Sequence, residues 1–334
     1  MQRQPIYYIS ALRVLATFLV ILIHASTGYL NRFSADGFDW HYANILHSFS
    51  RFSVPLFVML SGALLLPKNE DTCLFYRKRM IRVLLPFLFW LVVYLVYYFY
   101  RYTPIDVLLA SRIVEISLDK LLHGPSAHLW FLYMILGLYL AVPFLQKIVV
   151  QASQKEILIF IGLWMLSLLL LNKKVGSYLP SLDLTFFSGY VGYLVFGYYL
   201  AARNIALPIA VSLSLVVCLG GLNTWGTYLL SLQQGAYDPA LYNYLGLNNV
   251  LLAGSVFLLF KQLIRRPIPR WAQAVDLYSF GIYLIHILLL NYIHPLIIAP
   301  TVLKVPIAAL LTLALSILAI YLLRRLPFGK YVSG

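Results

Sequence analysis

Long apolar runs separated by short polar segments make up most of the chain. A bilayer core of about 30 Å requires a helix of about 20 apolar residues, and the runs approach or reach that length. The pattern therefore predicts an all-α fold: a polytopic membrane helix bundle of about ten transmembrane helices, in one domain covering residues 1–334. The predicted spans cover residues 7–30, 43–66, 83–100, 129–146, 157–171, 184–202, 206–222, 243–260, 277–298 and 305–323.

Lysine and arginine are unevenly distributed between the two sets of loops. If the amino terminus is in the cytoplasm, most of them fall in cytoplasmic loops, as the positive-inside rule requires. We therefore predict that both termini are cytoplasmic. The mixed segment of residues 103–127 then lies outside, where we expect a loop with a short interfacial helix.

The composition agrees with a multi-pass membrane protein. Of the 334 residues, 62% are hydrophobic and 11% are charged, and the mean hydropathy is +0.84, which leaves no room for a soluble catalytic domain. The net charge of +14 does not indicate nucleic-acid binding, because the basic residues lie in short loops between apolar runs. We therefore expect no nucleic acid as a partner. The two cysteines, Cys73 and Cys218, have no metal-binding spacing, so we expect no bound metal.

Two ionisable residues, Arg13 and His24, interrupt the first apolar run, which is too long for a signal peptide. At about 100° per residue they point to the same side of a helix, about 16 Å apart along its axis. Thr17, Val20 and Thr27 continue that stripe, which suits a helix facing a polar interior. Ionisable groups in a membrane span require a partner, a water-filled cavity or a function. The alternative is a packed helix whose Arg and His bond only to neighbours.

The second span repeats this arrangement. His47, Arg51, Val58 and Ser61 fall on one helical face, and Pro55 is expected to bend the helix between them. If the polar stripes of the first two spans face each other, they enclose a cavity.

Depth along the two spans divides this predicted cavity into two levels. His24 and Arg51 lie at similar distances from the outer ends of their spans, with His47 nearby, and form the outer level. Arg13 and Ser61 lie near the inner ends and form the inner level.

A basic cluster, Arg77, Lys78, Arg79 and Arg82, precedes the third span. We interpret Arg77 and Lys78 as ordinary cytoplasmic loop charges. Arg79 and Arg82 are three positions apart on one face of a helix at the membrane surface. Such a pair of guanidinium groups suits the binding of phosphate.

Three residues of later spans are further candidates for a cavity lining. His128 and Trp130 begin the fourth span at the outer interface, where the alternative is an aromatic belt that contacts headgroups. His286 lies in the ninth span, where the alternative is a buried histidine bonded to a neighbour.

Every acidic residue falls in a loop or at the end of a predicted span. We therefore expect no intramembrane carboxylate of the kind that proton-coupled transporters usually carry. The same distribution excludes a Ser-His-Asp triad within the membrane, so a catalytic histidine would be oriented by an amide, a hydroxyl or the backbone.

Together these stretches resemble the motifs of the integral-membrane acyltransferase 3 family, in the family's order and over nearly the whole chain. The stretches are Arg13 with His24, residues 51–62 with Ser-Val-Pro-Leu-Phe, residues 79–86, His128-Leu-Trp130-Phe-Leu, and Gly281-Ile-Tyr-Leu-Ile-His286. Within the family the chain is most similar to the stand-alone surface-polysaccharide O-acetyltransferases, such as the type acting on enterobacterial common antigen.

The resemblance implies a multi-pass O-acyltransferase of the bacterial cytoplasmic (inner) membrane, in which acetyl-CoA or another acyl-CoA is the co-substrate. The acceptor is a hydroxyl of a cell-surface glycan or lipid-linked glycan. His24, as general base, and Arg13 are then the catalytic residues. The expected acyl-CoA-binding residues are Arg79, Arg82 and Ser61. The expected residues of the acceptor cavity are Arg51, His47, His128, Trp130 and His286.

Other interpretations stay open at this point. A flippase or exporter of glycolipids would use the same polar stripes without transferring an acyl group, and a membrane sensor with a degenerate acyltransferase body is a third class. The acyl group is acetyl or succinyl, and the acceptor sugar and the oligomeric state are open. Transfer is either direct or through a covalent intermediate on His24 or Ser61.

Overall fold

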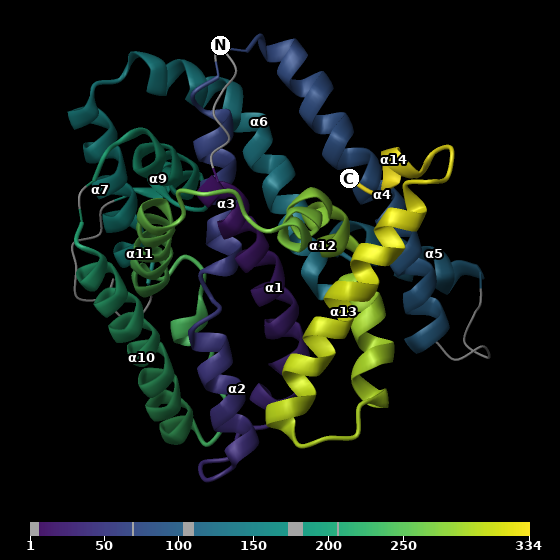
Figure 1. The fold of residues 1–334 in the computed structure, drawn as a ribbon. Coiled ribbons are helices and arrows are strands. Elements are labelled where there is room, and N and C mark those ends of the chain that lie inside the picture. Colours follow the sequence, from purple (N-terminus) through teal and green to yellow (C-terminus); the bar gives the residue numbers. More distant parts are fainter. Residues whose placement is uncertain (1–6, 69, 103–109, 173–182, 206) are drawn as a thin grey trace.

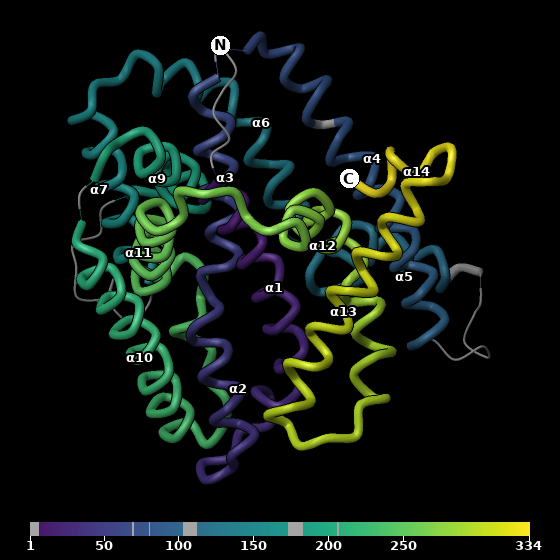
Figure 2. The backbone as a smooth tube through the Cα atoms, viewed as in Figure 1, coloured from purple at the N-terminus to yellow at the C-terminus, as the bar shows by residue number. Residues whose placement is uncertain are grey.

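The computed structural model describes residues 7–68, 70–102, 110–172, 183–205 and 207–334. Within those ranges every regular element is a helix and none is a strand, which confirms the predicted all-α fold. Figure 1 shows long helices side by side, and the tube in Figure 2 follows the loops that join them. The α-helices are α1 Tyr7–Leu30, α2 Phe38–Ser48, α3 Ser53–Leu65, α4 Thr72–Tyr102, α5 Ala110–His123, α6 Trp130–Gln151, α7 Gln154–Leu170, α9 Val191–Ala202, α10 Ile209–Gln234, α11 Leu247–Leu263, α12 Arg270–Leu296, α13 Thr301–Leu323 and α14 Gly329–Val332. The 3-10 helices are η2 Ala127–Leu129, η3 Thr185–Phe187 and η4 Ala240–Tyr242.

Seven helical segments in the described ranges, with α2 and α3 counted as one, are long and apolar enough to cross a membrane. Helices α9 and α11 are shorter apolar helices. Several predicted limits were wrong, since α4 begins at Thr72 and α10 continues to Gln234. Part of the predicted outer loop, residues 103–109, lies outside the described ranges, and α5 is a short helix in the rest of it. The number of ten spans and the cytoplasmic termini stay predictions.

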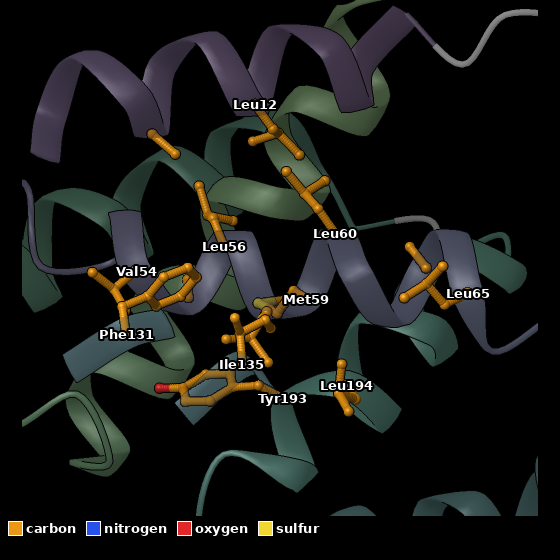
Figure 3. Packing of buried hydrophobic residues seen from close by; sticks show 14 of the residues in the cluster. Leu12, Val54, Leu56, Met59, Leu60, Leu65, Phe131, Ile135, Tyr193 and Leu194 are labelled. Atoms are coloured by element: carbon orange, nitrogen blue, oxygen red, sulfur yellow. The ribbon is translucent and has the colours of Figure 1, made fainter. Parts of the chain in front are cut away.

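Helix α1 lies within the bundle and brings both of its ionisable residues into contact with other helices. It packs against α2, α3, α11, α12 and α13, as Figure 1 shows. In Figure 3, Leu12 of α1 points toward Leu56 and Leu60 of α3, and Leu12 and Leu56 are completely buried. Because lipid is as apolar as leucine, close van der Waals packing of this kind holds membrane helices together.

Two glycines allow α3 and α9 to cross at very short range. A Cβ atom on Gly62 would lie 1.9 Å from the carbonyl oxygen of Leu194, and one on Gly197 would lie 2.1 Å from that of Met59. Since no larger residue fits at either position, the crossing fixes the depth and rotation of α3. The side chain of Ser61, next to Gly62, is positioned as a result.

The second predicted span is broken, and the break does not lie at Pro55, where we expected a bend. Helix α2 ends at Ser48 and α3 begins at Ser53, so residues 49–52 separate two helices. The physical reason is that the proline ring clashes with the carbonyl of residue i−4, here Arg51, so the helix stops before it. Pro55 itself lies in the first turn of α3, where a missing N–H group costs nothing.

Candidate active site

A cavity of about 380 Å³ lies between α1, α3, α4, α6 and α12. Its apolar walls include Phe57, Leu60 and Phe131. The charged residues that line it are Arg13, Lys68, Arg79, Arg82 and Asp276. Cations thus outnumber carboxylates in the lining, and we call this space the basic cavity. A low-dielectric wall around such a set of charges concentrates positive potential on a bound anion.

The predicted inner level is brought together in this cavity. Arg13 and Ser61 line it, as do Arg79 and Arg82, although these residues come from three different helices. The hydroxyl of Ser61 donates to the carbonyl of Phe57 at 2.9 Å, so its oxygen keeps lone pairs for a ligand.

Arg13 has a protein partner that the sequence analysis did not anticipate. Its guanidinium forms an ion pair with the carboxylate of Asp276. Asp276 is the seventh residue of α12, which begins at Arg270 and not at 277. The expectation that all carboxylates lie in loops or at span ends was therefore wrong for Asp276. The predicted boundary was too late because Arg270, Gln273 and Asp276 lower the hydropathy of the first turns of α12.

The basic cluster of α4 divides between the protein surface and the basic cavity. Lys78 donates to Glu70 at 2.9 Å and is exposed, and Arg77 is exposed, so both are ordinary surface charges. The same hydrogen bond lowers the pKa of Glu70 below its usual value. Arg79 lines the cavity instead, and its Nε atom is buried without a hydrogen-bond partner in the part of the chain that the structure describes.

Three histidines from distant parts of the chain form a cluster. The ring centroid of His24 lies 5.3 Å from that of His286 and 6.4 Å from that of His128, and the other two rings are 5.2 Å apart. His286 and His128 are buried, whereas His24 is partly exposed. Of the alternatives for His128, the structure thus favours a buried site over an aromatic-belt position.

Hydrogen bonds fix the protonated nitrogen of one ring. Nδ1 of His286 lies 2.6 Å from the carbonyl oxygen of Tyr283, so Nδ1 is the donor and Nε2 carries the lone pair. Nδ1 of His128 lies 3.0 Å from the hydroxyl of Ser126. In the described ranges, the Nε2 atoms of His128 and His286 are buried without partners, and no protein group forms a hydrogen bond with the ring of His24. The cluster can therefore accept or relay a proton.

Arg51 and His47 lie beside this cluster, as the predicted outer level requires. A guanidinium nitrogen of Arg51 lies 3.2 Å from Nδ1 of His47, and because arginine only donates, the imidazole accepts. Arg51 also donates to the hydroxyl of Tyr244 at 3.2 Å. Its charge is close enough to interact electrostatically with His24.

Trp130 belongs to an aromatic group next to Arg51. Its ring stacks on that of Tyr244 with centroids 5.7 Å apart and contacts that of Tyr190 at 5.8 Å. Trp130 is 37% exposed, so the protein does not enclose its ring completely. Tyr244 thus joins Trp130 to Arg51, a link that no spacing in the sequence indicated.

A narrow crevice separates the basic cavity from the histidine cluster. Phe57 and Tyr283 line both the basic cavity and the crevice, which ends at His286. The crevice has no room for a water molecule. Its other lining residues are Thr17, Val20, Ile21 and Ile282. The predicted inner and outer levels are therefore adjacent, with apolar side chains, Thr17 and Tyr283 between them.

These features define a multi-pass helical membrane protein with a cationic cavity next to a buried histidine cluster. A family model described as an acyltransferase domain, Acyl_transf_3, matches residues 6–321. Because this match covers nearly the whole chain, the chain belongs to the acyltransferase 3 family, and the protein is a membrane acyltransferase. No curated relative and no solved structure matches the chain significantly.

Proposed function

We propose that the protein transfers an acetyl group from acetyl-CoA to a hydroxyl of a cell-surface polysaccharide or its lipid-linked precursor. The observation that carries this proposal is the contact between the basic cavity and the histidine cluster through the crevice at Phe57 and Tyr283. An anionic donor held in the basic cavity is thus separated from the proton acceptors of the histidine cluster only by the side chains that line the crevice. The protein lies in the bacterial inner membrane, and the basic cavity opens to the cytoplasm, which contains the acetyl-CoA.

The basic cavity suits the donor because coenzyme A carries several phosphate groups. Arg79, Arg82 and Lys68 line it together with Arg13, and guanidinium groups bind phosphate through paired, charge-assisted hydrogen bonds. In this arrangement Arg79 and Arg82 hold the nucleotide end. Ser61 and Arg13 lie along the pantetheine arm. Helix α1 continues from Arg13 to His24, so Arg13 lies on the helix that joins the basic cavity to the histidine cluster.

His24 then acts as the general base. The acceptor oxygen attacks the thioester carbonyl carbon while its proton passes to a ring nitrogen of His24. The carbon–sulfur bond breaks, and the departing thiolate of coenzyme A takes that proton. The lone pair on Nε2 of His286, whose ring is 5.3 Å from that of His24, provides a second proton acceptor in the cluster.

The test uses purified protein in vesicles, radiolabelled acetyl-CoA and a lipid-linked glycan. We expect label in the glycan, and a loss of at least about a hundredfold in His24→Gln, the lower end of what a general base contributes. His123→Gln, at a histidine whose side chain is 74% exposed on α5, is the matched control and should keep full activity. Movement of unmodified lipid across the vesicle without labelling would instead support the exporter, and full activity of His24→Gln would refute the role of His24.

A further inference from the structure

Residues 49–52, which separate α2 from α3, have no role in the binding of acetyl-CoA proposed above. Helix α3 begins at Ser53, whose N–H donates to the carbonyl of Ser50 at 3.0 Å, and Leu56 donates to the carbonyl of Phe52 at 2.9 Å. The N-terminal end of a helix also carries partial positive charge, and such ends in broken membrane helices often bind anionic groups. Arg51 lies in the break itself and adds a full charge.

The hydrogen-bond and ring partners of Arg51 found in the described ranges are an imidazole and tyrosine side chains. The guanidinium donates to His47 and to the hydroxyl of Tyr244, each at 3.2 Å, and lies over the ring of Tyr242 at 4.7 Å. The ion pairs found in the described ranges involve other cations. A cation held within a membrane bundle is costly without a counter-charge. No ion pair found in the described ranges includes Arg51, so its guanidinium suits the binding of an anion.

Polar atoms without partners surround the same break. Ser53 is completely buried and His47 is 1% exposed. Within the described ranges, the hydroxyl of Ser53, Nε2 of His47 and Nε of Arg51 are buried and have no hydrogen-bond partner. Buried polar atoms in native proteins are almost always satisfied, so three together indicate a bound group that completes their hydrogen bonds.

The aromatic group beside the break supplies the other half of a sugar site. Trp130 and Tyr244 stack on each other, and Tyr244 also bonds Arg51. The flat C–H face of a pyranose packs on aromatic rings, while tyrosine hydroxyls and guanidinium groups bind its oxygens. An anion at Arg51 would place the attached sugar against Trp130.

We propose that the acceptor glycan carries an anionic group, a carboxylate or a phosphate, which binds Arg51 and the hydroxyl of Ser53 at the start of α3. The sugar ring lies on Trp130 and Tyr244, and the hydroxyl to be acylated faces His24. This inference rests on the proposed acyl transfer and specifies its acceptor class. The competing role for Arg51 is to stabilise the oxyanion of the transition state, which would leave acceptor binding unchanged.

The experiment measures sugar binding by calorimetry to the purified protein in detergent, without acyl-CoA and at constant ionic strength. The probes are methyl glucuronide, glucose 1-phosphate and the neutral methyl glucoside. We expect at least one charged sugar to bind the wild type about tenfold or more tightly than the neutral one. Arg51→Gln should abolish this preference, Arg51→Lys should retain part of it, and Arg32→Gln, at an exposed arginine beyond α1, should retain all of it.

The results of this experiment distinguish a carboxylate from a phosphate, and the site at Arg51 from the basic cavity. Preference for the glucuronide indicates a carboxylate on the sugar, and preference for glucose 1-phosphate indicates a phosphate at the anomeric carbon. Equal binding of charged and neutral sugars, no binding of either charged sugar, or an unchanged preference in folded Arg51→Gln and Arg51→Lys would overturn the proposal. Loss of the preference only in Arg82→Gln would place the anion in the basic cavity and would also overturn it.

Because this measurement needs no acyl transfer, it separates the two proposals. A protein that binds charged sugars through Arg51 but labels no glycan would refute the acyltransfer reaction proposed here and leave the anion site standing. A protein that acetylates a glycan but shows no Arg51-dependent preference would refute the anion site alone.

Discussion

The guanidinium of Arg13 pairs with the carboxylate of Asp276, which lies 263 positions later in the chain. The pair joins α1 to α12 in the wall of the basic cavity, where the two side chains are 26% and 20% exposed. It therefore holds Arg13 in one orientation and partly neutralises its charge before any donor binds. Asp276 also carries the only acidic side chain among the residues found to line this cavity.

We predict opposite effects of Asp276→Asn on binding and on turnover. Removing a negative charge from the cavity should strengthen acetyl-CoA binding about threefold or more at low salt, because phosphate is no longer repelled. The single-turnover rate should fall by about tenfold or more, because Arg13 loses the partner that orients it. The unfolding free energy should fall by about 1–3 kcal/mol, as expected for a charged hydrogen bond that is partly buried.

The measurements are calorimetric affinity, rapid-quench single turnover and thermal unfolding of the same preparations. Asp36→Asn, at an exposed aspartate in the loop after α1, is the control for a lost negative charge. Weaker acetyl-CoA binding together with an unchanged single-turnover rate would show that Asp276 contacts the donor and does not position Arg13.

Asp276 also shows where the sequence analysis reached its limit. The apolar run that it identified begins at residue 277, but α12 begins at Arg270. Hydropathy locates the part of a helix that suits lipid, whereas the helix continues into polar residues wherever its backbone hydrogen bonds can form. A carboxylate in such an extension is invisible to a search for charges inside apolar runs.

Periodicity was more informative within a single straight helix. It predicted that Arg13 and His24 share one side of α1, and the structure places the first in the basic cavity and the second in the histidine cluster. It did not predict that His128 and His286 meet His24. Their meeting depends on how distant helices cross, and crossings such as that of α3 and α9 are set by backbone contacts at Gly62 that no periodicity reports.

We predict that Arg79→Gln and Arg82→Gln each weaken acetyl-CoA binding by about tenfold, the value of one charge-assisted hydrogen bond. The loss should shrink as salt rises, because screening weakens the interaction in the wild type. Arg77→Gln, in which the exposed residue does not line the cavity, is the matched control. Affinities are measured by calorimetry at two salt concentrations. Equal losses in all three variants would mean that the effect is general surface charge.

The crossing of α3 and α9 yields a stability prediction. Gly62→Ala places a Cβ atom 1.9 Å from a backbone carbonyl oxygen, so the helices must separate. We expect a loss of about 1–3 kcal/mol or more, the usual cost of overpacking, and a lower midpoint of thermal unfolding. Gly28→Ala in α1 meets nothing within 4 Å and should be neutral or slightly stabilising, because alanine favours a helix. Equal midpoints for the two variants would contradict the close crossing.

The last prediction concerns the crevice between the basic cavity and the histidine cluster. Val20 lines it, and the space has no room for a water molecule, so an acyl group can pass only if it is small or if side chains move. Val20→Ala should widen the crevice and raise the rate with butyryl-CoA relative to acetyl-CoA by about tenfold, since a change of one or two methylenes in a pocket is worth about 1–3 kcal/mol. Val54→Ala, at a buried valine of α3 that lines neither space, controls for general loosening of the bundle. The measurement is the ratio of the two kcat/KM values in each variant. The same ratio in wild type, Val20→Ala and Val54→Ala would mean that the acyl group does not travel through this crevice.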